Sequence, residues 1–262
     1  MNGANFGLVA ESYSRSRNDI PHQLFESLQL RNIHFAGKKV ADVGCGTGAL
    51  TRKIKIRNGH VVGVDPSTQL LEKAKAFCEE DFLQIQYVIG TAEQTGLETS
   101  IYDIVTIMRA WHWFDREKTI EEVKRLLKPN GTLLVIDSGF TSDSPLVAQT
   151  ISVIEKFILD GIKPAGSKAH SKQRINGFPV EWFEEWRQSK LDIRDFYKFD
   201  YTVSFTNEEW VDRIESISWM TGLKEEEREI AKFSLLQSLK DRFGVEAVHT
   251  VPHFCAVCIL TK

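Results

Sequence analysis

Three glycines in five residues, Gly44, Gly46 and Gly48, follow a short apolar stretch of the chain. Glycine lets the backbone turn sharply and come into contact with a ligand. Asp65 ends a second apolar stretch, 21 residues after Gly44. From that position a carboxylate can accept hydrogen bonds from both hydroxyls of a ribose. The spacing therefore predicts a ligand that contains adenosine, bound beyond the ends of two parallel strands.

Two strands and a helix must position these residues. Residues 40–43 and 61–64 are mostly apolar, with Asp42 as the charged exception, and fit buried parallel strands. Thr47 or Thr51 is expected to cap the intervening helix, whose first backbone N–H groups favour an electron-rich ligand group. These elements predict the start of a doubly wound α/β fold.

The glycine pattern alone leaves two cofactors open. Gly44, Gly46 and Ala49 satisfy the fingerprint of nicotinamide dinucleotide enzymes as well as that of proteins that bind S-adenosylmethionine (SAM). The wider sequence favours SAM, because five blocks follow in order: VADVGCGTGALT, VVGVDPS, GTAEQTGL, YDIVTIMRAWHWFD and RLLKPNGTLLVID. This succession, spread over roughly half of the chain, resembles the class I SAM-dependent methyltransferases.

The resemblance implies a single SAM-dependent methyltransferase domain over residues 1–262, with a seven-stranded, mostly parallel, doubly wound sheet. Its strand order is expected to be 3-2-1-4-5-7-6, with strand 7 antiparallel, and a helical cap is expected beside it. An N-terminal lid segment is predicted at 1–34 and cap insertions at 141–190 and 205–244. Periodicity and turn residues predict the later strands near 85–89, 104–108, 132–136, 193–204 and 245–260, and helices near 21–31, 67–79, 116–127, 207–220 and 223–243.

The family also implies which residues contact the cofactor. The segment YSRSRNDIP resembles the family's entry segment through Tyr13, Arg17 and Pro21, and there the arginine meets the methionine carboxylate, which a guanidinium suits. Thr91 replaces an aspartate that accepts a bond from the adenine amino group, so that contact is expected to be weaker. Gln69 is expected either to bind the base or to face water. The full predicted set is Tyr13, Arg17, Asp42, Gly44, Cys45, Gly46, Asp65, Pro66, Gln69, Thr91, Ala92, Glu93 and Arg109.

The stretch after the fourth strand, RAWHWFD, is predicted to face the transferred methyl group and the substrate, since ligands lie beyond the carboxyl ends of such strands. It resembles a group of small-molecule methyltransferases that includes trans-aconitate methyltransferase-like proteins. Trp111 and His112 are the predicted substrate contacts. His112, whose free pKa is about 6.5, is the candidate catalytic base, with a loop-holding role as the alternative. For the three residues that follow, core packing and an Asp115 helix cap are favoured over a cation–π role beside the sulfonium.

Composition limits the other classes of function. A net charge of −3 and a pI of about 6.2 predict no general attraction to nucleic acid. No apolar stretch approaches the length of a membrane span, and the first residues lack a signal pattern, so a cytoplasmic protein is expected. Cys255 and Cys258 lie on a predicted strand, where residues three apart face opposite sides, and no metal site is expected. Trp182, Phe183 and Trp186 have helical spacing and are expected in a helix core.

The predicted function is methyl transfer from SAM to an oxygen, nitrogen or carbon of a small molecule. A SAM-binding partner subunit without catalysis and an NAD-dependent oxidoreductase are the alternatives from other classes, and RNA methylation is disfavoured by the lack of a basic patch. The protein is expected to be a monomer or a homodimer. The sequence carries no motif that names the methyl acceptor.

Overall fold

A computed structural model describes residues 20–158 and 161–262 of the chain. Its contacts divide these residues into two units, and each is described here by itself. We call the first the sheet unit; it holds Ile20–Ser138, Gly166–Phe199 and Cys255–Lys262. We call the second the helical unit; its described residues lie within Gly139–Ala165 and Asp200–Phe254. Tyr13 and Arg17, two predicted cofactor contacts, lie outside the described residues.

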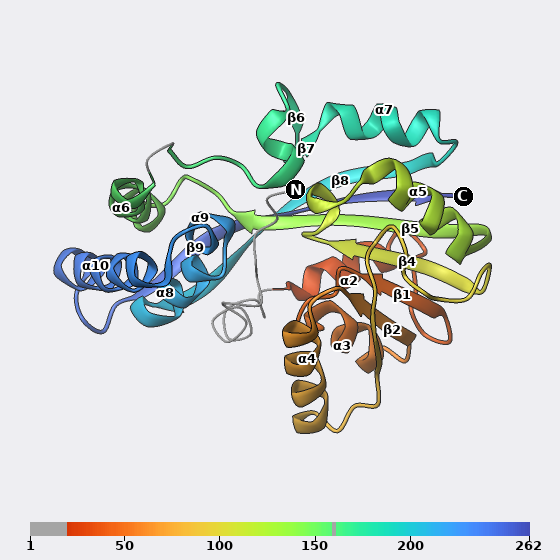
Figure 1. Cartoon of the computed structure of the whole chain (residues 1–262), viewed down its shortest axis with the longest axis horizontal. Coiled ribbons are helices and arrows are strands. Elements are labelled where there is room, and N and C mark those ends of the chain that lie inside the picture. The colour runs from red at the N-terminus through yellow and green to blue at the C-terminus, as the bar shows by residue number, and fades with distance from the viewer. Residues whose placement is uncertain (1–19, 159–160) are drawn as a thin grey trace. The chain divides into compact units, whose positions relative to one another are not determined.

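The main sheet has seven strands in the order β3-β2-β1-β4-β5-β9-β8, mostly parallel with one antiparallel strand. Since β8 and β9 are the sixth and seventh strands of this sheet along the chain, the predicted order is confirmed. Figure 1 shows β1, β2 and β4 side by side, and β1 pairs in parallel with both of its neighbours. The strand bounds are β1 Lys39–Val43, β2 His60–Asp65, β3 Gln86–Ile89, β4 Tyr102–Met108, β5 Leu127–Phe140, β8 Asp192–Thr206 and β9 Val248–Thr261.

The central strands form because their side chains are apolar on both faces. Every residue of β1 after Lys39 and every residue of β2 after His60 is buried, as expected of parallel strands covered by helices. The helix α3 (Ala49–Ile56) packs on β2, α4 (Thr68–Glu80) on β2 and β3, and α5 (Arg116–Leu126) on β4. Each turns a buried apolar stripe toward the sheet.

Several predicted boundaries shift. The helix expected near 21–31 is α2 (His22–Gln29), with Pro21 at its N-cap position. The strand expected at 132–136 is much longer, since β5 runs from Leu127 to Phe140. The helix expected at 207–220 is broken into α8 (Asn207–Glu215) and α9 (Ser218–Thr221), and α10 covers Glu225–Phe243.

The predicted cap for α3 is wrong. The N-cap position belongs to Gly48, which has a left-handed backbone, and no side chain of the described residues caps this helix. The Thr51 hydroxyl donates instead to Asp42, a stronger acceptor because it is a carboxylate. The start of α3 therefore offers its first backbone N–H groups without a side-chain cap from the described part of the chain.

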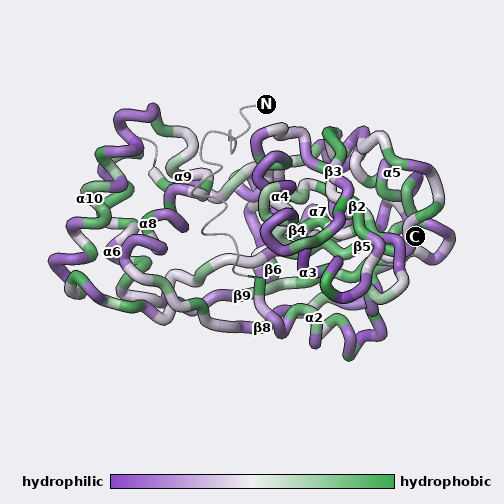
Figure 2. The backbone as a smooth tube through the Cα atoms, turned by 90° about the horizontal axis from the view of Figure 1, so that it is seen from below, coloured by the Kyte–Doolittle hydropathy of each residue, from purple (hydrophilic) through white to green (hydrophobic). Residues whose placement is uncertain are grey.

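The helical unit has its own apolar core. Side chains from α6 (Pro145–Ile154), α8 and α10 meet around the buried Trp210, whose indole N–H donates to the Thr150 hydroxyl at 2.8 Å. Figure 2 shows hydrophilic and hydrophobic residues interspersed along α10, as expected of a helix with one buried face. The stretch at 225–229 is largely exposed, although Arg228 is buried.

Residues 141–190 do not form one element group. The helix α6 and the 3-10 helix η3 (Glu155–Phe157) belong to the helical unit. The 3-10 helix η4 (Gly166–His170), the short pair β6 (Arg174–Ile175) and β7 (Phe178–Pro179), and α7 (Val180–Gln188) belong to the sheet unit. Trp182 and Trp186 are fully buried on α7, which confirms their predicted core role, while Phe183 is half-buried.

Two classes of feature are missing from the described residues. Across 20–158 and 161–262 no helix is both long and apolar enough to cross a bilayer. Within the same ranges, no group of three or more His, Cys, Asp or Glu side chains is placed to hold a metal ion. All four cysteines are free thiols, including Cys255 and Cys258 on β9.

Candidate functional site

The glycine loop leaves β1 in a conformation that only glycine adopts easily. Gly44, Gly46 and Gly48 have φ angles of +70°, +55° and +72°. A Cβ atom on Gly44 would lie 2.8 Å from the Ala110 Cβ and 2.9 Å from the Phe114 Cζ, so the backbone here packs directly on the stretch after β4. The structure thus brings the carboxyl ends of β1 and β4 into contact, where the sequence predicted the ligand.

Asp65 holds the glycine loop from the end of β2. One carboxylate oxygen accepts from the Gly46 N–H at 2.9 Å, and the other accepts from the Ser67 N–H at 2.9 Å. Burial raises the pKa of this carboxyl, and the two backbone bonds act in the opposite direction. Each oxygen keeps a further lone pair, so the same carboxylate can accept from ligand hydroxyls.

Asp42 is the most deeply buried acid of the site. Its two oxygens accept from the Thr51 hydroxyl at 2.6 Å and the Thr106 hydroxyl at 2.7 Å. Loss of hydration, helped by the nearby Asp65 charge, raises the pKa of Asp42 to about 6 against the effect of the two hydroxyl bonds. Burial and the same two acids also raise the pKa of the Cys45 thiol, which keeps it protonated at neutral pH. The Asp42 carboxylate therefore ties β1, α3 and β4 together.

The turn after β3 is connected to the stretch after β4. The Glu93 carboxylate accepts from the Asp115 N–H at 2.9 Å. The Thr91 hydroxyl accepts from the Gln94 N–H at 3.2 Å, which leaves it exposed at the surface of the turn. Ala92 is buried. Glu93 thus has a structural contact in addition to its predicted cofactor role.

Pro66 and Gln69 flank the start of α4 and are exposed. The Gln69 side-chain oxygen accepts from the Ser67 hydroxyl at 3.2 Å. The Ser67 hydroxyl in turn accepts from the Leu70 N–H and caps the helix. Neither Pro66 nor Gln69 is pinned by core packing, so both remain accessible to a ligand.

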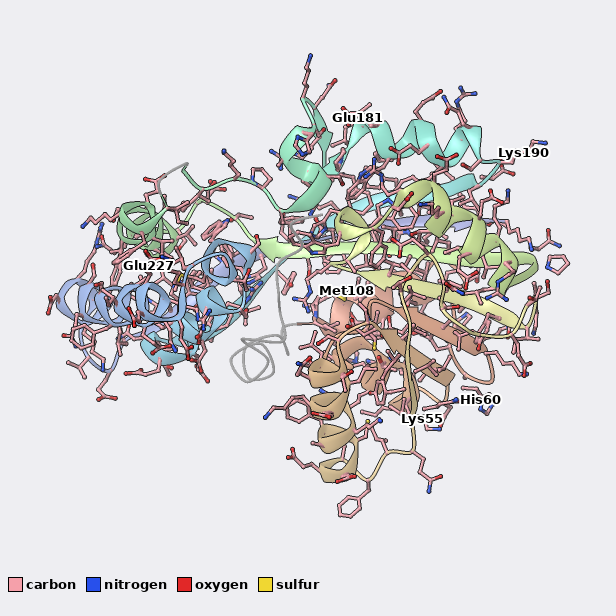
Figure 3. The ribbon with its side chains drawn as sticks, in the orientation of Figure 1. Lys55, His60, Met108, Glu181, Lys190 and Glu227 are labelled. Atoms are coloured by element: carbon pink, nitrogen blue, oxygen red, sulfur yellow. The ribbon has the colours of Figure 1, made fainter. Side chains whose placement is uncertain are left out.

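The strand β4 ends at Met108, which Figure 3 labels, and the stretch after it begins at Arg109. Arg109 has a left-handed φ of +56°, and its N–H donates to the Ile136 carbonyl at 2.8 Å. Trp111 and His112 follow in a 3-10 helix, η2 (Trp111–Trp113), and both are buried. The Trp111 ring lies 5.7 Å from that of Trp186.

The sequence favoured structural roles for the three residues after His112, and the structure agrees with these roles in part. Asp115 caps α5, since its side chain accepts from the Lys118 N–H, which confirms that prediction. Trp113 and Phe114 are half-buried, and the Trp113 ring lies 4.9 Å from that of His112.

Some functional candidates could not be found from the sequence. The Thr106 hydroxyl donates to Asp42, which lies 64 positions earlier in the sequence. A Cβ on Gly48 would lie 2.3 Å from the Tyr87 hydroxyl. Asp137 and Lys168 form a buried ion pair beside the end of β5. Each of these contacts joins residues that are distant in the sequence, so no local sequence pattern indicates it.

Comparison with known proteins finds methyltransferases of similar sequence and similar fold. A family model described as a methyltransferase domain matches residues 41–135. An uncharacterized methyltransferase of Mycobacterium tuberculosis is 35% identical over 129 residues, which cover 49% of this chain and 50% of the relative. A ubiquinone biosynthesis O-methyltransferase of Haemophilus ducreyi is 29% identical over 206 residues, covering 76% of this chain and 84% of the relative. A solved SAM-dependent methyltransferase from Aquifex aeolicus has the same fold, with a TM-score of 0.51 and 16% identity over 71% of this chain and 91% of that one.

Residues 41–135 of this chain are thus similar to a methyltransferase domain. The matched region begins within β1 and ends within β5. It therefore contains the glycine loop, Asp65 and the stretch after β4. The chain spans about half the length of the mycobacterial relatives that it matches.

The residues present fit the family's cofactor. A Cβ on Gly44 would clash with Ala110 and Phe114, so this turn of the loop requires glycine. The uncapped start of α3 offers N–H donors, and Asp65 offers acceptors at the end of β2. This donor and acceptor set suits a nucleoside with a polar tail.

Proposed function

We propose that this methyltransferase transfers the methyl group of SAM to a nucleophilic oxygen, nitrogen or carbon of a small molecule. The observation that carries the proposal is the glycine loop tied to Asp65 and packed on the stretch after β4, inside the region that matches the methyltransferase domain. When bound, SAM supplies a methyl carbon that its sulfonium has already activated. The protein then has to hold the two reactants in line and exclude water, and such positioning can lower a barrier by several kcal/mol.

In this proposal the predicted contacts take the following roles. Asp65 would accept from the ribose hydroxyls, and Gly44 and Gly46 would let the backbone approach the nucleoside. Arg17 would pair with the cofactor carboxylate. Pro66, Gln69, Thr91, Ala92 and Glu93 would border the adenine, with Tyr13, Asp42, Cys45 and Arg109 around the remainder of the cofactor. Trp111 and His112 would border the acceptor, and the cap boundaries at 141–190 and 205–244 remain part of this proposal.

The acceptor is proposed to be a small molecule because the chain has a net charge of −3, which offers nucleic acid no general attraction. A carboxylate acceptor needs no base, whereas an alcohol or phenol needs one. The same proposal places the protein in the cytoplasm, as a monomer or a homodimer.

Cofactor binding is the first test. S-adenosylhomocysteine should raise the melting temperature, and NAD should not. Asp65→Ala removes charge-assisted bonds worth about 1.5–3 kcal/mol each, so calorimetry should show at least about a tenfold loss of affinity. Stabilisation by NAD alone would favour the oxidoreductase, and unchanged affinity in the variant would remove Asp65 from the site.

Turnover is the second test. Incubating the protein with methyl-labelled SAM and a metabolite pool should give a labelled small molecule. Binding of S-adenosylhomocysteine without any labelled product would instead favour the non-catalytic partner subunit.

A further inference from the structure

A lysine side chain is largely shielded from solvent next to Asp137 of β5. Lys168 of η4 forms an ion pair with Asp137, and the two side chains are 13% and 9% exposed. Asp137 directly follows Ile136, whose carbonyl accepts from the Arg109 N–H. Because Ile136 pairs with Met108, the last residue of β4, the ion pair lies just beyond the carboxyl end of β4, in the part of the sheet from which the acceptor contacts are proposed.

The segment that carries Lys168 lies against the stretch that carries His112. Gly166 has a φ of +53°, and a Cβ on it would lie 2.2 Å from the His112 carbonyl oxygen and 3.2 Å from the His112 Cδ2. This backbone contact allows only glycine and holds η4 on η2. Lys168 follows two residues later on the same 3-10 helix.

The ion pair satisfies only part of the ammonium. A lysine ammonium has three N–H donors, and within residues 20–158 and 161–262 the Asp137 carboxylate is the hydrogen-bond partner of this one. The neighbouring Ser167 hydroxyl is buried and has no partner in the same ranges. Buried donors without acceptors are costly, so this arrangement favours a ligand that brings an acceptor.

The charges of Lys168 and Asp137 indicate which charge a bound ligand group should carry. Asp137 comes from a sheet strand and orients the ammonium. A ligand ammonium would have to compete with Lys168 for that carboxylate and would bring two cations together. A ligand oxygen that carries negative charge can use the remaining N–H donors while the Asp137 contact stays in place.

We propose that Lys168, positioned by Asp137, binds an anionic oxygen of the methyl acceptor, a carboxylate or an ionised phenol. This inference rests on the proposed methyl transfer. Transfer to such an oxygen forms the new O–C bond as the C–S bond breaks, and the electron pair of that bond stays on sulfur. The sulfonium charge and the oxyanion charge cancel, so no proton has to be removed and His112 need not act as a base.

The test uses the full chain saturated with S-adenosylhomocysteine, with binding read from chemical-shift changes and thermal shifts. Benzoate and para-nitrophenolate are the anionic probes, and benzylamine is the cationic probe of similar size. The anions should bind and benzylamine should not. Lys168→Met should weaken the anions by about tenfold or more, without changing the affinity for S-adenosylhomocysteine.

Three further variants separate recognition from folding. Lys168→Arg keeps the charge and should retain anion binding. The double change Asp137→Asn with Lys168→Met removes both buried charges together, so it should fold but should not bind the anions. Lys172→Met removes an exposed lysine of the same segment and should have no effect.

The outcomes are distinct for the two proposals. Failure of S-adenosylhomocysteine to bind would overturn the proposed function itself. Normal cofactor binding with no anion binding, with preferred benzylamine binding, or with anion binding that Lys168→Met leaves unchanged would overturn the role of Lys168. Once an acceptor is known, Lys168→Met should raise its KM far more than it lowers kcat. A loss of stability together with a lower kcat, with KM unchanged, would mark the ion pair as purely structural.

Discussion

Replacing the buried Asp42 by asparagine should stabilise the protein at neutral pH. Burial raises the pKa of Asp42 from 3.8 to about 6 in the folded protein, although two threonine hydroxyls donate to it. A tenfold change in an acid dissociation constant corresponds to about 1.4 kcal/mol, so the folded state carries a penalty of about 3 kcal/mol once the carboxyl is ionised. Asparagine resembles the protonated acid in shape and has no charge, and the two threonine hydroxyls can rotate to match its amide.

The pH dependence follows from proton binding. Below the ordinary pKa both the folded and the unfolded chain hold the proton, so the acid and the amide should be equally stable there. As the pH rises from 3.8 toward about 6, the unfolded chain releases its proton first, and the free energy of unfolding of the wild type falls. The advantage of Asp42→Asn should therefore grow through that window and remain at about 3 kcal/mol above about pH 7.

The assay is urea unfolding of both proteins at several pH values, without cofactor. The difference between the two removes the contribution of all other carboxyls. Asp103→Asn is the control of opposite sign, because Lys128 and the Lys39 N–H bind the Asp103 carboxylate and hold its pKa below the usual range. That variant should lose stability relative to the wild type as the pH rises. A pH-independent difference, or an Asp42→Asn protein that is less stable than the wild type above about pH 7, would refute the reasoning.

Three further changes test other contacts of the site. Gly48→Ala should cost roughly 1–3 kcal/mol, because φ is +72° and the new Cβ would meet the Tyr87 hydroxyl, and Tyr87→Phe in the same chain should recover part of the loss in urea unfolding. Arg17→Ala should weaken SAM in calorimetry but leave adenosine nearly unchanged, since adenosine has no carboxylate; equal losses would indicate a folding effect. His112→Gln should lower thermal stability or cofactor affinity together with turnover, because the ring is buried; a selective fall in turnover of about 10²–10⁴ would instead identify a general base.

The sheet order was implied by the resemblance to a known family. The residues by themselves were enough to predict the glycine loop, the helix cap at Asp115 and the core role of Trp182 and Trp186. These features depend on local chemistry: apolar runs, glycines where φ is positive, a carboxylate before a helix, and aromatic residues at helical spacing. The carboxyl ends of parallel strands meet at one edge of a sheet, so the order of the motifs also predicted where they would gather.

Only the tertiary structure decided which hydrogen-bond and ion-pair partners these side chains have. Thr51 was expected to cap a helix but donates to Asp42, because folding places a buried carboxylate within its reach, and Thr106 joins them from a strand far along the chain. The raised pKa of Asp42 depends on that burial and has no local signal. The pairing of Lys168 with Asp137 likewise requires η4 to return to the end of β5. Hydration, burial and contacts between distant segments set these properties, and a sequence pattern reports none of them directly.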